Sequence, residues 1–233
     1  MADITLYDLA GADERVRFSP YVWRVKMALA HKGLAFETVP WRFADKGAIA
    51  FSGQGLVPVM VDGGTVVSDS WAIACHLDDT YPELPTLMGR ALGRAHALTV
   101  KHWVERALHP LLTRIILPEI AAAIHEGDRA YFRETRERRF GTTLERWAVP
   151  PEQGLPPLRD ALAPARATLE LQPYLGGERP SFADYILFGP FMWARGVSRV
   201  EPLAGDDPLH AWREKLLDMF DGMGRKAPSA AAG

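Results

Sequence analysis

The stretch Phe18-Ser19-Pro20-Tyr21-Val22-Trp23-Arg24 stands where a loop gives way to a helical pattern. Ser19 is a residue favoured just before a helix. Pro20 is tolerated at the first helical position, because its missing N–H would be unpaired there in any case. A helix start also carries unpaired N–H groups and a partial positive charge, which suit an anion such as a thiolate. The stretch therefore predicts either a plain helix cap or a cap that also holds and acidifies a bound thiol.

Around this stretch, the first part of the chain alternates between strand and helix patterns. The expected elements are a strand at Ile4–Leu9, a helix at 19–32 that stops at Gly33, a strand at Phe36–Trp41, a β-hairpin at 57–67 and a helix at 69–81. Asp62-Gly63-Gly64 supplies the tight turn of the hairpin, and Asp69 and Ser70 cap the second helix. This order of elements is that of a thioredoxin-like unit, and order alone leaves other α/β folds open.

The rest of the chain predicts an all-helical half. Residues 83–93 hold a proline and two glycines, and we expect them to link a domain at 1–82 to a helical domain at 94–225. In the helical stretch that begins at Arg94, Pro110 and Pro118 should kink or interrupt the helix, since each removes a backbone donor.

Three further segments of this half have distinct patterns. Residues 149–157 are rich in proline and predict a connector between two amphipathic helical stretches. Ser181-Phe182-Ala183-Asp184 is a capping box before an apolar helix, and we expect Asp184 to stabilise the fold rather than to act in catalysis. Asp207-Pro208 starts a last helix, and the small polar tail 226–233 is expected to be disordered.

Composition narrows the class of protein. The chain has 233 residues, a formal net charge of −2 and about half hydrophobic residues, which is ordinary for a globular protein with no general attraction to nucleic acid or to anionic membranes. The single cysteine, Cys75, rules out an internal disulfide and a cysteine-cluster metal site. We see no signal peptide and no apolar run that would cross a bilayer, so we expect a cytoplasmic protein.

Three pairs of residues together resemble the N-terminal domain of the glutathione S-transferases: Ser19-Pro20, Val57-Pro58 and Asp69-Ser70. The resemblance covers nearly the whole chain, because a helical half follows where that family has one. It implies a thioredoxin-like N-terminal domain (βαβ–ββα) followed by an α-helical C-terminal domain. The local sequences SPYVWR and VPVMVDGG are most similar to bacterial lignin β-etherases and related fungal etherase-like transferases. The loop between Trp41 and Leu56 departs from the family pattern.

The resemblance implies that Ser19 lies beside the sulfur of glutathione as the catalytic residue. A free thiol has a pKa of roughly 8.5, and a helix N-terminus can lower it by a unit or more. A serine hydroxyl with helix amides behind it is then sufficient, and no general base is required. Tyr21 is a competing donor, although we favour packing for it, and Tyr7 on the first strand is a further alternative.

The same resemblance implies the remaining glutathione contacts. Val57 next to a cis Pro58 would pair its main chain with the cysteinyl backbone of glutathione. Ser70 would hold the γ-glutamyl carboxylate, Asp69 would neighbour its amine, and Gln54 and Tyr21 would complete the set. Pure helix capping by Asp69 and Ser70 is compatible with binding. Glutathione is expected as the co-substrate, with no metal.

The electrophile site is expected against the helical half, near Trp23, His102 and Trp103, with Trp193 and Arg195 also within possible reach. Aromatic residues at helical spacing more often belong to a core, so none of these residues is expected to be catalytic. The mixed-charge run 133–139 is interpreted as a solvated helix face. Cys75 is expected to be an inert, buried thiol.

Two functions remain open from the sequence. The first is a glutathione transferase whose thiolate attacks an electrophilic carbon, with cleavage of aryl ethers as the chemistry that the etherase-like resemblance favours. The second is a non-catalytic member of the fold that binds glutathione, hydrophobic ligands or partners. A thioredoxin-type redox enzyme is disfavoured, because Ser19 precedes Pro20 and no second cysteine exists. The family resemblance also implies a homodimer.

Overall fold

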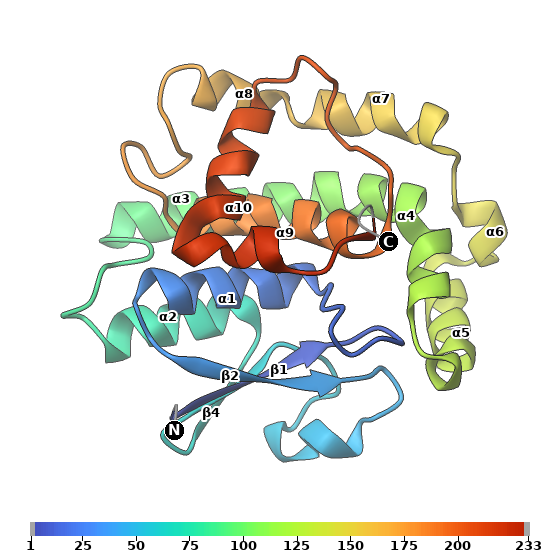
Figure 1. The fold of residues 1–233 in the computed structure, drawn as a ribbon, viewed down its shortest axis with the longest axis horizontal. Helices are drawn as coiled ribbons and strands as arrows, with labels where there is room; N and C mark the ends of the chain where they lie inside the picture. Colours follow the sequence, from blue (N-terminus) through green and yellow to red (C-terminus); the bar gives the residue numbers. More distant parts are fainter. Residues whose placement is uncertain (1–2, 231–233) are drawn as a thin grey trace.

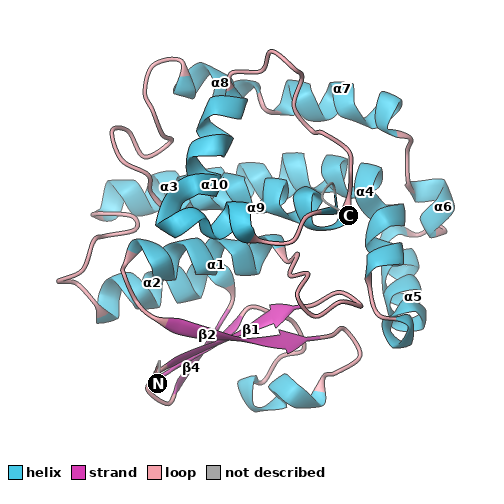
Figure 2. Ribbon diagram, in the orientation of Figure 1, coloured by secondary structure: helices cyan, strands magenta, loops and turns pink. Residues whose placement is uncertain are grey.

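The computed structural model describes residues 3–230, which form a small sheet and a larger helical part (Figures 1 and 2). In the view of Figure 1, the sheet lies at the bottom, with helices α1 (Pro20–His31) and α2 (Ser70–Thr80) above it. The helical half stacks on the far side of α1. This arrangement confirms the expected thioredoxin-like domain followed by an α-helical domain.

The sheet has four strands in the order β2-β1-β3-β4. They are β1 (Ile4–Leu9), β2 (Phe36–Trp41), β3 (Val59–Asp62) and β4 (Thr65–Ser68). β1 runs parallel to β2 and antiparallel to β3, and β3 and β4 form the expected hairpin. Gly63 and Gly64 make its turn at φ values of 51° and 91°, a region that glycine enters without steric cost. The loop before β3 contains a 3₁₀ helix, η1 (Gly47–Ser52).

Ten helical segments make up the described part of the second half. They are α3 (Ala91–Trp103), η2 (Val104–Leu108), α4 (His109–Ala123), η3 (Glu126–Asp128), α5 (Arg129–Phe140), α6 (Leu144–Trp147), α7 (Pro151–Ala161), α8 (Ala163–Leu169), α9 (Phe182–Val197) and α10 (Leu209–Lys226). η2 is a π-helical turn that joins α3 to α4 without a break. α3 begins three residues before the expected start at Arg94, and the proposed domain boundaries stay a prediction.

The two prolines expected to interrupt the long helix are accommodated in different ways. Pro110 occupies the first turn of α4, directly after the π-helical turn. Pro118 lies inside α4, which continues to Ala123, so the expected interruption there is wrong. A proline at 118 leaves the carbonyl of Arg114 without its helical donor. The amide of Val149 donates to that carbonyl at 3.0 Å, so the missing bond is replaced from another segment.

The proline-rich connector expected at 149–157 is largely helix, which corrects that prediction. α7 begins at Pro151, where a proline fits the first helical position, and it continues through Pro156 and Pro157. Packing explains the override of local propensity: Gly154 faces Ile115 of α4 so closely that a Cβ there would overlap the isoleucine side chain.

The capping box at the start of α9 is confirmed. The Ser181 hydroxyl accepts from the amide of Ala183 at 3.2 Å, and Asp184 Oδ2 accepts from the Ser181 amide at 2.9 Å. Asp184 Oδ1 also accepts from the Leu175 amide at 2.7 Å and from Trp212 Nε1 at 3.0 Å. The carboxylate is fully buried and ties α9 to the preceding loop and to α10. This supports the structural role expected for it.

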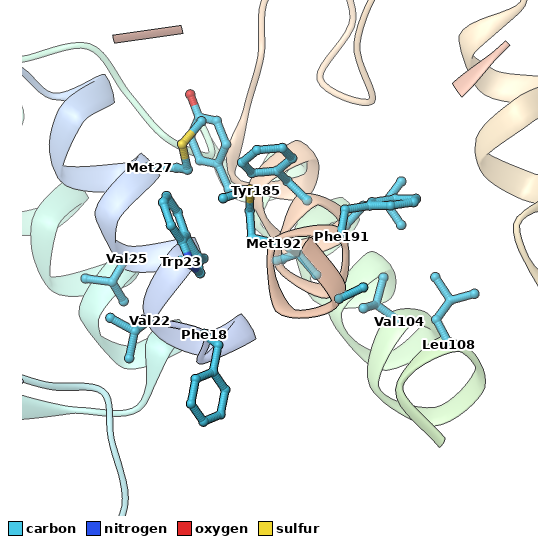
Figure 3. Close-up of a cluster of buried hydrophobic side chains, with 14 of the residues drawn as sticks. Phe18, Val22, Trp23, Val25, Met27, Val104, Leu108, Tyr185, Phe191 and Met192 are labelled. Atoms are coloured by element: carbon cyan, nitrogen blue, oxygen red, sulfur yellow. The ribbon is translucent and has the colours of Figure 1, made fainter. Parts of the chain in front are cut away.

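The two halves meet along α1 and α9. Figure 3 shows the buried side chains of this contact, with Trp23 and Met27 of α1 on the side of Tyr185 and Met192 of α9. The helices approach so closely that a Cβ at Gly189 would overlap the main-chain carbonyl oxygen of Pro20. The helical half is therefore seated directly on the backbone that follows Ser19.

The C-terminal segment contacts the residues that follow α9. Lys226 ends α10, and Arg199 Nε donates to the carbonyl of Ala230 at 3.1 Å. The rest of the tail expected to be disordered, residues 231–233, lies outside the described residues. Within residues 3–230, no helix is long and apolar enough to cross a membrane.

Candidate functional site

Ser19 is the N-cap of α1. Its φ and ψ of −64° and 119° are extended, and its Oγ accepts from the amide of Val22 at 3.2 Å. A hydroxyl that accepts in this way still has its own hydrogen to donate. Ser19 Oγ is therefore able to cap the helix and to donate to a bound anion at the same time.

The first turn of α1 leaves one amide for such an anion. Pro20 has no N–H, the Val22 amide binds Ser19 Oγ, and the Trp23 amide donates to the Ser19 carbonyl at 3.0 Å. The amide of Tyr21 has no hydrogen-bond partner among the described residues. The hydroxyl of Ser19 and the amide of Tyr21 thus form a pair of donors at the positive end of the helix.

A cavity of about 730 Å³ opens beside this cap. One side of it, the N-terminal wall, comes from the sheet domain and includes Ser19, Gln54, Val57, Pro58 and Asp69. The opposite side, the helical wall, comes from α3 to α6 and α9 and includes Lys101, Glu105, His109, Pro110, Thr113, Leu117, Ile120, Phe132, Arg136, Arg139, Phe140, Trp147 and Trp193. A space of this size between two domains is typical of a small-molecule site.

The N-terminal wall offers main-chain groups and a cap. The peptide bond between Val57 and Pro58 is cis, as expected, and the N–H and C=O of Val57 have no partner within residues 3–230. Asp69 has a φ of 77° and caps α2 by accepting from the amides of Trp71 and Ala72 at 2.8 and 3.1 Å. An unpaired strand-like N–H and C=O can bind the backbone of a peptide ligand.

Tyr21 and His109 face each other across the cavity. The Tyr21 hydroxyl lies 3.2 Å from Nδ1 of His109, and the two rings meet edge to face at 5.2 Å. Burial, with repulsion by the neighbouring cations, lowers the pKa of His109 to about 3, so the imidazole is neutral at physiological pH. Burial also raises the pKa of Tyr21. The phenol and the neutral imidazole share this hydrogen bond, and neither group supplies charge to the cavity.

Next to this pair lies a cluster of charged residues, of which Arg24 is buried and Lys101 and Glu105 line the cavity. Arg24 is fully buried, and its Nη1 binds Glu105 Oε1 at 2.7 Å. Lys101 Nζ binds the other oxygen of Glu105 at 2.8 Å. The guanidinium of Arg24 also lies over the ring of Tyr21 at 4.7 Å. Although burial opposes the charge of Glu105, the two cations hold its pKa below the usual value, and its negative charge is fully engaged.

Two protein-family models match this chain and identify its family. Residues 18–80 match the glutathione S-transferase N-terminal domain, and residues 95–214 match the glutathione S-transferase C-terminal domain. The chain belongs to the glutathione S-transferase family. The expected family is thereby confirmed.

Solved structures and curated proteins show which members of the family this chain is similar to. A glutathione S-transferase of Ceriporiopsis subvermispora, solved in complex with glutathione, is 25% identical, with a TM-score of 0.81 over 94% of this chain and 96% of that one. The glutathione transferase GSTFuA3 of Phanerochaete chrysosporium is also 25% identical, with a TM-score of 0.75 over 94% and 92%. These fungal proteins agree with the expected likeness to fungal etherase-like transferases.

Among curated proteins, the glutathione S-transferase-like protein ustS of Aspergillus flavus is 29% identical over 169 residues, 66% of this chain and 55% of that protein. Glutathione S-transferase Z2 of Arabidopsis thaliana is 42% identical over 69 residues, 28% of this chain and 31% of that protein. The matches to these first relatives therefore span about half of their length or less.

The fold brings most of the expected glutathione residues to one cavity. Ser19, Tyr21, Gln54, Val57, Pro58 and Asp69 all line it. Ser70 is buried behind the N-terminal wall, and its hydroxyl has no partner in the described structure. Tyr7, the alternative donor, packs its ring 5.5 Å from Phe51 and does not line the cavity.

The residues expected near the electrophile lie elsewhere, with one exception. Trp23 is buried between the domains and donates its Nε1 to the carbonyl of Arg17, His102 is exposed, and Trp103 packs on the core. None of the three lines the cavity, whereas Trp193 does. Arg195 donates to the carbonyl of Arg225 instead.

The structure also exposes residues to the cavity that the sequence did not single out. Arg136 and Arg139 line it, although they belong to the run 133–139 that was interpreted as a solvated face. Phe132 and Phe140 lie four residues from Arg136 on the same helix, and that spacing is the signal that identifies a mixed aromatic and cationic face.

Two further features concern side chains that could bind a metal ion and the thiol of the single cysteine. Within residues 3–230, no group of three histidine, cysteine or acidic side chains is placed to hold a metal ion. Cys75 is half-buried in α2, and burial raises the pKa of its thiol. A protonated thiol is a poor nucleophile, and Cys75 is not among the residues that line the cavity.

Proposed function

We propose that this protein is a glutathione transferase that ionises the glutathione thiol at Ser19. The observation that carries the proposal is the position of Ser19: its hydroxyl caps α1, keeps a hydrogen to donate, and stands in the wall of a cavity between the two domains. The likeness to a transferase solved with glutathione supports the choice of thiol.

The N-terminal wall has the groups that the tripeptide needs. The free N–H and C=O of Val57 would pair with the cysteinyl backbone, as an added strand does. Asp69 at the exposed end of α2 would neighbour the γ-glutamyl amine, and Ser70 would hold its carboxylate. Gln54 would contact the ligand from the loop before β3. This fixes the sulfur near Ser19 Oγ.

The chemical step follows from the electrostatics of the cap. Donation from Ser19 Oγ and from the Tyr21 amide favours the thiolate, and each unit by which they lower its pKa corresponds to about 1.4 kcal/mol. The sulfur then attacks an electrophilic carbon held against the helical wall. In aryl ether cleavage, a carbon–sulfur bond forms at the carbon next to a ketone, the carbon–oxygen bond breaks, and the electron pair leaves on a phenoxide.

The test compares Ser19→Ala with Ser19→Thr. The alanine variant should lower kcat/KM at pH 7 about 100-fold, the size of effect seen when a preorganised donor to a developing anion is removed. It should also lose the ultraviolet absorbance of bound thiolate, while the threonine variant keeps both in part. The folded structure should persist, because loss of a cap costs only about 1 kcal/mol.

The outcomes separate the enzyme from a binding protein. Thiolate absorbance without turnover of aryl ethers, aryl halides or disulfides would favour the non-catalytic alternative. Absence of glutathione binding at millimolar concentration would overturn the proposal. Equal pH–rate profiles for the wild type and Ser19→Ala would transfer the donor role to Tyr21.

A homodimer is part of the proposal. Exposed apolar side chains on the loop before β3, on β4 and on α3 support a partner surface; Phe51, Val66 and Leu98 are 52%, 40% and 38% exposed. Sedimentation of the wild type should give twice the chain mass, and a monomer at micromolar concentration would contradict this part.

A further inference from the structure

Two arginines on the helical wall carry charge that no acid in the described structure neutralises. Arg139 lines the cavity and has neither a hydrogen bond nor an ion pair within residues 3–230. Arg136 donates to the hydroxyl of Thr135 at 2.9 Å, and its guanidinium lies over the rings of Phe43 at 4.7 Å and Phe132 at 4.5 Å. Burial and the neighbouring Arg139 lower the pKa of Arg136.

Two other arginines of α5 do have carboxylate partners. Arg133 binds Glu137 at 2.8 Å and Glu145 at 2.6 Å on the outer face of α5, and Arg138 binds Glu134 at 2.5 Å. Carboxylates therefore pair with two exposed arginines of α5, whereas Arg139, which is also exposed, lines the cavity. Neither of the two that face the cavity has one.

The acids that line the cavity are already engaged. Glu105 is held by Arg24 and Lys101, and Asp69 caps α2 on the opposite wall. His109 is neutral, so it neither adds to nor cancels the charge of the arginines. The part of the helical wall around α5 thus keeps a net positive charge that a bound anion would compensate.

Aromatic rings line the same cavity as the two guanidinium groups. Phe140 stacks on Trp147 with ring centroids 4.0 Å apart and planes 12° from parallel, and both line the cavity beside Arg139. Phe43 and Phe132 flank Arg136. A flat ring packs well against such faces, and a carboxylate on that ring would meet the planar donors of an arginine.

We infer that the electrophile of this transferase is an aromatic compound bearing a carboxylate, with the ring against Phe140 and Phe132 and the carboxylate on Arg139 and Arg136. The inference rests on the proposed function, because it takes the thiolate of glutathione at Ser19 as the attacking group. It adds the charge of the second substrate, which the proposed function leaves open.

The test uses two electrophiles of equal shape, 4-chloro-3-nitrobenzoate and 4-chloro-3-nitrobenzamide. In each, the thiolate adds to the carbon that bears chlorine, the carbon–sulfur bond forms, and chloride leaves with the electron pair. The intrinsic reactivities of the two compounds differ by the same factor for every variant. The ratio of kcat/KM for the acid to that for the amide therefore reports how the protein treats the charge.

Arg139→Gln should lower this ratio about fivefold, the size expected for a partly exposed ion pair. Arg139→Glu should lower it further, and added salt should reduce the preference of the wild type. The matched control is Arg138→Gln, on the same helix but facing Glu134, which should leave the ratio unchanged. An unchanged ratio in Arg139→Gln would overturn the inference.

Two further outcomes keep the inference separate from the proposed function. If Arg139→Gln raises the KM of glutathione equally with both electrophiles, the arginine holds a glutathione carboxylate and the inference is wrong. If neither compound is conjugated, calorimetry can compare the binding of the preformed S-(4-carboxy-2-nitrophenyl)glutathione with that of its amide. The ratio of the two dissociation constants then reports how the protein treats the charge. Tighter binding of the acid by the wild type, lost in Arg139→Gln, would then support the anion site while transferase chemistry fails.

Discussion

The N-terminal wall of the cavity offers caps and main-chain groups, whereas the helical wall offers long side chains. Ser19, Val57 and Asp69 act through local backbone geometry, and each is fixed within a few residues of sequence. Arg136, Arg139 and His109 reach the cavity only because separate helices pack in one arrangement. The difference teaches that one wall suits a constant ligand and the other is free to change with the second substrate.

The largest expected effect is a loss of stability caused by a substitution in the helical half, which leaves every residue of the N-terminal wall unchanged. Asp184→Ala removes a buried carboxylate that accepts from Leu175, Ser181 and Trp212, and it should lower the free energy of unfolding by about 3 to 5 kcal/mol. Urea unfolding measures this loss. Asp160→Ala, at an exposed acid of α7, is the control and should change the free energy of unfolding by less than about 0.5 kcal/mol.

A second change tests whether the two walls are independent. Gly189→Ala places a methyl group against the Pro20 carbonyl, so α9 must shift from the residue next to Ser19. We expect a loss of up to about 3 kcal/mol of stability together with weaker glutathione binding. Gly205→Ala, which meets no atom within 4 Å, should change neither. A destabilised Gly189→Ala variant with unchanged glutathione affinity would show that the walls are separable.

A third prediction concerns the pH dependence of stability that follows from the neutral His109 on the helical wall. The pKa of His109 is lowered by burial to about 3, so the unfolded chain binds this proton more readily than the folded one. Stability should therefore fall as pH drops below about 6.5, by about 2 kcal/mol between pH 7 and pH 5. His109→Gln should remove that component of the urea-unfolding curve, and His96→Gln, at an exposed histidine, should retain it.

The smallest expected effect concerns a residue that the sequence placed near the electrophile. His102 is exposed and outside the cavity, so His102→Ala should change kcat/KM for a neutral aryl halide by less than about twofold. Thr113→Leu, which narrows the helical wall, should raise the KM of the same substrate several-fold. A strong effect at His102 would mean that the second substrate binds beyond the described cavity.

Local chemistry explains what could be predicted from the sequence. The caps at Ser19, Asp69 and Ser181 and the Gly63-Gly64 turn each depend on neighbouring residues, and the structure confirms all four. These features predicted the strand–helix order of the first domain and the start of α9, whereas Gln54, Val57 and Pro58 of the N-terminal wall were implied by the family resemblance.

Packing between distant segments explains what could not. Residues 149–157 have the composition of a loop, yet Gly154 lies against Ile115 and the segment is helical. Trp23 looked available for a substrate, but it is buried under α9. Which side chains of α5 line the cavity depends on how that helix packs against the loop after β2. The spacing of Phe132, Arg136 and Phe140 indicates a shared helix face, but it does not show that this face lines the cavity.

The π-helical turn η2 has a consequence for how such a pocket can be altered. Lys101, Glu105, His109, Thr113 and Leu117 all reach the cavity at intervals of four residues, although side chains spaced this way drift by about 40° per step around a regular α-helix. The wider turn offsets part of that drift. A π-helical turn holds one residue more than an α-helical turn, so deleting one residue within it would let the turn close to regular α-helix with α3 and α4 still in place. The chain can therefore lose a residue at this point of the helical wall while the side chains before and after the turn keep their positions in the pocket.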